Sequence, residues 1–253
     1  MPIGVVELAH WSAATLDTRE GRERQVAEPV IWPAAAVETL VSAADGLGLV
    51  STPPPSSPAY DHTLIMGGTT TAHRLRTALA RATSDAGVDL GAVIGVASSR
   101  PIYDWERARH GDVIDSEEWR DLGKVLTGEF ESEPFPEPDN AAVDVTTTGK
   151  LGLQLRLLSA PATSAAQRAT TADGLDFLVR QLRRPLGRVL VVTSAIYVPY
   201  TFFVAVGRLA EHGLDRLEVI GTPTSRDGPS RSLAQRFAQE INSTLQAIAE
   251  YCG

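Results

Sequence analysis

The feature that most constrains the fold is a regular alternation of short apolar runs and helical patterns, which begins near residue 62. The apolar runs lie at 63–66, 91–97, 151–158, 189–192 and 217–220. Runs of this length without polar alternation are typical of strands buried on both faces. Helical periodicity follows most of them, with apolar positions three and four residues apart. Strand–helix alternation implies right-handed crossovers, so the sequence predicts an α/β fold, a three-layer sandwich with a mostly parallel central sheet.

The 253 residues are 43% hydrophobic and 21% charged, an ordinary composition for a globular protein. We expect a single α/β domain over 1–253, in which residues 1–59 form an N-terminal extension that packs on the rest. Within this extension the patterns predict short strands at 4–8 and 29–32 and a helix at 34–44.

Residues 102–150 form an acidic insertion that is punctuated by prolines. A helix is expected at 116–126 and an irregular loop at 130–140. The insertion is either a lid over the edge of the sheet or a solvated connection, and its composition favours the connection. The next strand is expected at 151–158.

Composition and charge disfavour several classes of protein. The net charge of −8 opposes non-specific binding to nucleic acid. No run approaches the roughly 18 apolar residues of a membrane span, and the first residues lack the basic region of a signal peptide, so we expect a cytoplasmic protein without a membrane partner. Cys252 is the only cysteine, and the five histidines show no ligand spacing, so no metal is expected.

The basic residues and the last helix bear on the source and the oligomeric state. Only two of the 23 basic residues are lysines, a bias typical of a GC-rich bacterial genome. The apolar stripe of the helix at 232–251 predicts core packing first and a homodimer face second.

Polar residues follow the predicted strands where each strand ends, and in a parallel sheet ligands bind just beyond these carboxyl ends. Gly67, Gly68 and Thr69 follow the first strand, and Arg74 lies in the next helix. A strand, a Gly–Gly turn and a helix in this order direct backbone N–H groups at one point, which suits an anion. The alternative is a tight turn in which only glycine fits. The spacing matches neither a dinucleotide fingerprint nor a Walker loop.

The later strands supply the other candidates. Arg100 follows the second strand and can hold a carboxylate or phosphate in a bidentate fork. The other ligand-binding candidates are Ser98, Ser99, Arg168, Thr171 and Thr193. The catalytic candidates are Asp173 as a general base, Ser194 as an orienting group, and Tyr197 or Tyr200 as a hydrogen-bond donor or acid. Helix capping is the alternative role for Thr193 and Ser194. Thr170 or Thr171 can cap the helix that starts near residue 170, with Asp173 in its first turn, where the helix dipole favours an acidic group.

Residues 61–251 resemble the DUF218 family (SanA/ElyC/YdcF-like proteins). The family pattern has a strand ending in Gly–Gly, an arginine in the next helix, a strand ending in Ser–Gly, an nT-x-E-N helix start and the signature VTS-x-x-H-x-x-R. The similar segments here are Leu64–Gly68 with Arg74 and Ala78, Ala97–Ser99, Thr170–Gly174 and Val192–Tyr200. In the signature, Tyr197 and Tyr200 replace the histidine and the arginine, and Gly174 replaces the asparagine of the helix start.

The resemblance implies a Rossmann-like fold and a pocket for a nucleotide-like or phosphorylated small molecule, with S-adenosylmethionine or a nucleotide as a candidate cofactor. One hypothesis is therefore an enzyme, biosynthetic or of hydrolase or transferase type, that acts on a polar or anionic metabolite at the carboxyl edge of the sheet. The other is a ligand-binding or regulatory module without catalysis, which the replaced histidine and arginine favour.

Overall fold

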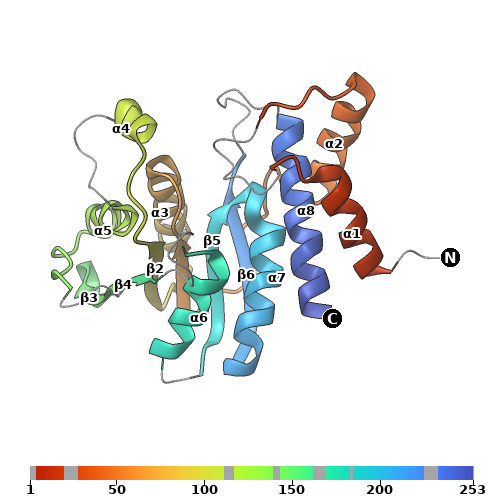
Figure 1. The fold of residues 1–253 in the computed structure, drawn as a ribbon. Coiled ribbons are helices and arrows are strands. Elements are labelled where there is room, and N and C mark those ends of the chain that lie inside the picture. Colours follow the sequence, from red (N-terminus) through yellow and green to blue (C-terminus); the bar gives the residue numbers. More distant parts are fainter. Residues whose placement is uncertain are drawn as a thin grey trace.

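The computed structural model describes residues 4–19, 28–110, 117–138, 143–161, 169–182, 185–224 and 233–252. At its centre lies a six-stranded sheet with the strand order β3-β4-β2-β1-β5-β6 (Figure 1). The strands are β1 (His62–Met66), β2 (Ala92–Ser98), β3 (Val143–Thr148), β4 (Gln154–Ala160), β5 (Gly187–Ser194) and β6 (Leu214–Thr222). All neighbouring strands are parallel except β3, which is antiparallel to β4. The predicted α/β sandwich with a mostly parallel central sheet is confirmed.

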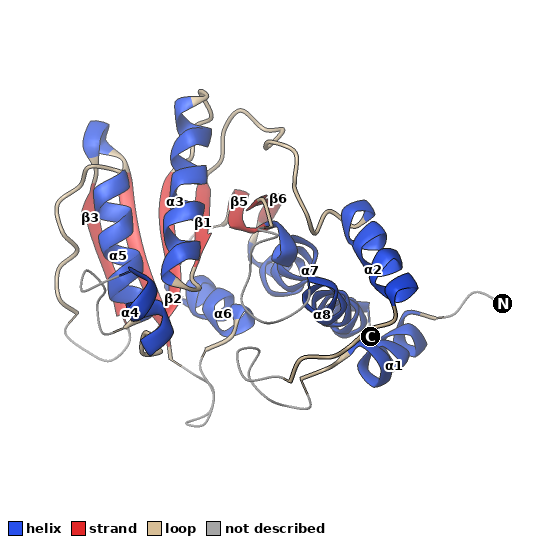
Figure 2. Cartoon of the chain, turned by 90° about the horizontal axis from the view of Figure 1, so that it is seen from above, coloured by secondary structure: helices blue, strands red, loops and turns tan. Residues whose placement is uncertain are grey.

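Two helices cover each face of the sheet. The pair α3 (Thr70–Asp85) and α5 (Glu118–Glu129) lies on one face, and α6 (Thr171–Gln181) and α7 (Val198–Leu209) lie on the other (Figure 2). Side chains of β1 alternate between the two cores: Ile65 packs with α3 and α5, whereas Leu64 and Met66 pack with α6 and α7. Burial on both faces explains why the strands read as continuous apolar runs.

The described part of the N-terminal extension contains two helices. Helices α1 (Val5–Leu16) and α2 (Ala34–Gly46) pack on the last helix, α8 (Leu233–Cys252), which packs on α7. The prediction of a strand at 4–8 is wrong, because Ala9, Ser12 and Leu16 recur at helical spacing and bury one face of α1. The helix predicted at 34–44 is confirmed as α2.

The strand predicted at 29–32 is also wrong. Prolines at 29 and 33 bracket this segment and remove two backbone donors. The N–H of Val30 donates to the side chain of Gln235 at 3.1 Å, and so takes no part in a sheet.

The acidic insertion contains more regular structure than the sequence predicts. It holds α4 (Asp104–His110), α5 at the predicted helix, and the edge strand β3. Strand β3 was missed because its polar, threonine-rich residues alternate between buried and exposed on a sheet edge. The strand expected at 151–158 begins three residues later, because residues 150–152 form a 3-10 turn that ends at Gly152 with φ 80°. No helix in the described ranges has the length and hydrophobicity that crossing a bilayer requires.

Candidate functional site

The topology of the sheet defines one preferred place for a ligand. From β1 the chain continues to β2 and β4 on one side of the sheet, and later returns to β5 and β6 on the other. The connections that leave β1 and β5 therefore diverge. In open α/β sheets, ligands bind in the crevice outside the carboxyl ends of two such strands. Here that position, the β1–β5 crevice, lies between Gly67 and Gly68 after β1 and Ser194 at the end of β5.

The Gly–Gly turn uses its N–H groups within the protein. The N–H of Gly67 donates to the carbonyl of Val96 at 2.6 Å, and that of Gly68 to Nε2 of His73 at 3.1 Å. Thr69 caps α3, because its hydroxyl accepts from the N–H of Ala72 at 3.3 Å. The predicted role of Gly67 and Gly68 as free donors to an anion is therefore not what the structure shows. A Cβ on Gly67 would meet the carboxylate of Glu118, so the tight-turn alternative explains this glycine.

Arg76, on α3, lies beneath the crevice and is only 3% exposed. Its Nη1 donates to the carbonyls of Met66, at 2.8 Å, and Gly67, while Nε and Nη2 donate to the hydroxyl of Ser194 at 3.2 and 3.1 Å. No carboxylate of the described residues forms an ion pair with Arg76, and one of its five N–H groups has no acceptor there. Burial lowers the pKa of Arg76 to about 10, against the opposing influence of Tyr197 and Glu118. The group thus stays a cation at neutral pH.

Arg100 has the opposite environment. Its Nη1 donates to Glu106 at 2.9 Å and its Nε lies 2.8 Å from Glu118, and all three side chains are buried. Burial alone would lower the pKa of Arg100, but the two carboxylates outweigh it and raise the pKa. The hydroxyl of Ser98 donates to Glu118 at 2.7 Å. Arg100 and Ser98, both predicted ligand-binding residues, are thus bound to acidic groups of the chain itself.

A buried histidine–carboxylate pair lies beside these arginines. Nδ1 of His73 is 2.6 Å from Oδ2 of Asp121, and their side chains are 0% and 6% exposed. Because Nε2 of His73 accepts from Gly68, Nδ1 is the ring nitrogen that donates to Asp121. Arg74 is exposed on α3, and its charge acts on Asp121. This histidine is a structural acceptor for the turn, with no free ring nitrogen for catalysis.

The remaining predicted residues lie around the rim or away from it. Asp173 and Thr170 form a capping box at the start of α6: Oδ2 of Asp173 accepts the N–H and the hydroxyl of Thr170 at 2.7 and 2.8 Å. Thr171 is the first residue of α6. Ser99 is exposed after β2, and its hydroxyl pairs with that of Ser159 at 2.8 Å. Thr170, one of the two predicted caps, is therefore the N-cap of α6, and Asp173 lies in its first turn as expected.

At the end of β5, Thr193 is buried and Ser194 is partly exposed. The guanidinium carbon of Arg76 lies 5.8 Å from the centre of the Tyr197 ring, and Tyr200 is on the first turn of α7. The structure thus brings Ser194 and Tyr197 together with Arg76. Arg168 lies outside the described residues.

Sequence reasoning missed Arg76 as a site residue and chose Arg74. The buried stripe of α3 contains Thr70, His73, Arg76 and Ala80, at helical spacing, whereas Arg74 is off the stripe. The periodicity of the helix therefore held the signal that separates the two arginines. The acidic partners Glu106 and Glu118 come from the insertion and carry no such signal.

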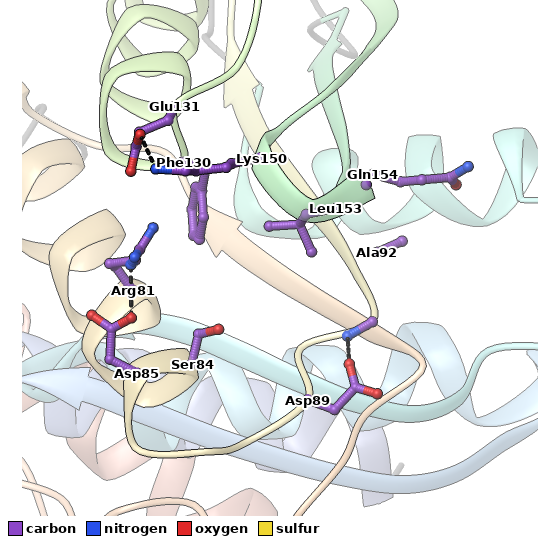
Figure 3. A pocket seen from close by; sticks show the side chains of 12 residues that line it. Arg81, Ser84, Asp85, Asp89, Ala92, Phe130, Glu131, Lys150, Leu153 and Gln154 are labelled. Carbon is purple, nitrogen blue, oxygen red and sulfur yellow. Dashed lines mark hydrogen bonds and ion pairs between the residues drawn. The ribbon is translucent and has the colours of Figure 1, made fainter.

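A separate depression of about 780 Å³ opens at the opposite, amino edge of the sheet (Figure 3). Its floor includes Phe130 and Leu153. Four of the charged residues on its walls form pairs, Arg81 with Asp85 at 2.9 Å and Lys150 with Glu131 at 2.7 Å, while Asp89 accepts the N–H of Gly91 at 3.0 Å. Both the arginine and the lysine side chain of this depression have carboxylate partners, unlike Arg76 at the β1–β5 crevice.

Comparison with known proteins finds distant relatives. Uncharacterized proteins of two Mycobacterium tuberculosis strains and of Mycobacterium bovis are each 26% identical to this chain over 235 residues. The alignments cover 85% of this chain and 66% of each relative, so the chain spans just under two thirds of their length. No protein-family model and no solved structure matches the chain.

Proposed function

We propose that the protein binds a small anionic metabolite, through a carboxylate or phosphoryl group, in the crevice between the carboxyl ends of β1 and β5. The observation that carries the proposal is Arg76, a buried guanidinium at the topological switch point without a carboxylate partner among the described residues. Burial of a charge is unfavourable unless an opposite charge and hydrogen bonds compensate. A bound anion would provide that compensation.

Ser194 is suited to assist Arg76. A serine hydroxyl has two acceptor lone pairs and one hydrogen to donate. Two N–H groups of Arg76 point at this oxygen, so the hydrogen of Ser194 is directed elsewhere and can bind an anion. The ring of Tyr197 borders the same guanidinium and offers an apolar surface for the body of the metabolite.

An enzyme that acts on this metabolite is the second candidate, favoured by the same contact. The N–H groups of Arg76 that donate to the hydroxyl oxygen of Ser194 would stabilise negative charge on that oxygen. A serine that acts as a nucleophile needs such stabilisation. Membership of DUF218, a nucleotide-like ligand, S-adenosylmethionine and a cytoplasmic location remain parts of the proposal. The family and its ligands are supported by the order of β1, the Gly–Gly turn, α6 and the Val192–Ser194 segment. The cytoplasmic location is supported by the composition.

The test is ligand-induced stabilisation of the folded protein. Thermal denaturation is measured with inorganic phosphate, nucleotides, sugar phosphates and S-adenosylmethionine, because a ligand at 100 times its Kd adds about 2.7 kcal/mol to the free energy of unfolding. Ser194→Ala and Arg76→Lys should reduce this stabilisation. Arg81→Met, on the same helix but at the amino edge, is the matched control and should retain it.

The outcomes separate the candidates. Stabilisation that is lost in Ser194→Ala but kept in Arg81→Met supports binding in the crevice. Equal stabilisation of all variants would overturn it. Product formation from the stabilising ligand, lost in Ser194→Ala, would favour the enzyme over the binding module.

A further inference from the structure

Helix α4 is attached to the rest of the molecule by polar contacts. Glu106 is its only buried residue, and Trp105 is 43% exposed. A second contact joins the ring of His110 to the hydroxyl of Thr71 at 2.8 Å. None of the hydrophobic clusters of the described residues includes a side chain of α4. This helix therefore lacks the apolar packing that holds the helices on the sheet.

The carboxylate of Glu106 occupies a complete set of anion donors. It accepts from the backbone N–H of Thr70 at the start of α3, at 3.0 Å, and from that of Tyr103 at 3.1 Å. Nη1 and Nη2 of Arg100 donate to it at 2.9 and 3.3 Å. A helix N-terminus and a guanidinium are the donors that bind oxyanions in many proteins. Here the chain places its own carboxylate in that position.

Glu106 is one of the two buried carboxylates that pair with Arg100 beside the crevice. Arg76 and Arg100 are the buried cations there, and Glu106 and Glu118 are buried anions. The two arginines flank one turn, because Arg76 donates to the carbonyl of Gly67 and Arg100 to that of Gly68. If Glu106 is withdrawn, Arg100 keeps only one of its two carboxylates, Glu118, so the net positive charge beside the turn rises by one. The adjacent Asp121 is already bound to His73 and lies near the charge of Arg74.

We propose that α4 is a lid, held closed by Glu106, and that an oxyanion group of the ligand competes with this carboxylate for the positive charge around the Gly67–Gly68 turn. Figure 1 shows α4 beyond the upper end of α3, where the turn lies. The inference rests on the proposed anion site at Arg76. It adds a regulatory element to that site: the closed lid lowers the affinity for an anion, and anion binding releases the lid.

The first test needs no ligand. Hydrogen exchange of the backbone amides of residues 104–110 is measured in the wild type, in Glu106→Gln and in Glu106→Asp. Glu137→Gln is the control, because it removes a carboxylate from an exposed ion pair with Arg120. Loss of a charge-assisted contact should increase exchange in α4 by about tenfold in Glu106→Gln. Glu106→Asp should restore part of the protection, and Glu137→Gln should match the wild type. Exchange in α4 that is the same in Glu106→Gln and Glu137→Gln would overturn the lid.

The second test measures the affinity for inorganic phosphate by calorimetry. Glu106→Gln should bind phosphate about tenfold more tightly than the wild type, because it loses the internal competitor. If Ser194→Ala weakens phosphate binding but Glu106→Gln and the wild type bind phosphate equally tightly, the proposed competition is overturned. A Ser194→Ala variant with unchanged phosphate affinity would instead contradict the proposed function, and the exchange measurement would still decide whether Glu106 holds α4.

Discussion

The hydrogen bond between His73 and Asp121 holds together three segments that meet at the crevice. His73 is on α3, Asp121 is on α5, and the other ring nitrogen of His73 accepts from Gly68. Replacement of Asp121 therefore tests whether this buried pair stabilises the turn. Both side chains are almost fully buried, so solvent screens their interaction little.

The structure sets the expected magnitude. Asparagine keeps the shape and one acceptor oxygen, so Asp121→Asn replaces a charge-assisted hydrogen bond by a neutral one. The difference between these two kinds of bond is about 1 kcal/mol in the free energy of unfolding. Asp121→Ala leaves the buried Nδ1–H of His73 without an acceptor, which adds about 1–3 kcal/mol to the loss. We expect the free energy of unfolding to decrease in the order wild type, Asp121→Asn, Asp121→Ala. For Asp121→Ala the total loss should be about 3 kcal/mol.

The pH dependence distinguishes a charge effect from a packing effect. Burial would raise the pKa of Asp121, but the hydrogen bond from His73 and the charge of Arg74 contribute to a net lowering. A carboxyl group with a lowered folded pKa stabilises the protein fully above its unfolded pKa, about 3.9, and loses this contribution as the pH falls through the folded value. The advantage of the wild type over Asp121→Asn should thus be constant between about pH 7 and 5 and shrink below about pH 4.

Urea unfolding followed by circular dichroism at several pH values measures this advantage directly. Equal stability of the wild type and Asp121→Asn at neutral pH would refute the reasoning. So would a difference that persists unchanged to about pH 3, because the carboxyl group of the unfolded chain, with a pKa of about 3.9, takes up its proton above that pH and the advantage shrinks as it does so.

Two further predictions concern the rim of the sheet. Thr170→Ala removes the capping box of α6 and should lower the free energy of unfolding by about 1 kcal/mol, as measured by thermal denaturation, while Thr170→Ser should retain most of it. Gly67→Ala places a methyl group against Glu118 and against the backbone of Val96 and Ala97, the latter two at 2.9 Å, and should cost about 1–3 kcal/mol in the same measurement. A Gly67→Ala variant as stable as the wild type would show that the turn can move away from β2.

The central sheet was predictable because its determinants are local. The inner strands β1, β2, β4 and β5 are short apolar runs. Thr170, one of the two expected caps, marks the start of α6. The edge strand β3 and helix α1 were not recognised, because each buries one face against a distant partner. Strand β3 depends on β4, and α1 depends on α8, more than 200 residues away. A one-sided pattern in a short segment does not reveal such a partner.

The candidate site shows the same limit at the level of single side chains. Position relative to strand ends identified the correct edge for Ser98, Arg100 and Ser194, because that position follows from the order of elements. It did not identify what each side chain binds. Arg100 and Arg76 are both basic residues near the Gly–Gly turn, yet one is neutralised by two carboxylates and the other by none among the described residues. Only the three-dimensional arrangement of the insertion decides between them.

The prediction of an anion at the start of α3 illustrates how this difference affects function. A helix N-terminus and an arginine do bind an oxyanion here, as expected: the N–H of Thr70 and the guanidinium of Arg100 both donate to it. The oxyanion, however, is the carboxylate of Glu106, 36 residues after Thr70 in the chain. Because Glu106 already pairs with Arg100, Arg76 is the buried arginine without a carboxylate partner among the described residues. The ligand is therefore expected on the β5 side of the turn, and not on the β2 side. If Glu106 can leave, the two positions become one larger anion site. The exchange of α4 amides in Glu106→Gln tests whether Glu106 holds α4, and the phosphate affinity of the same variant tests whether the two positions act as one site.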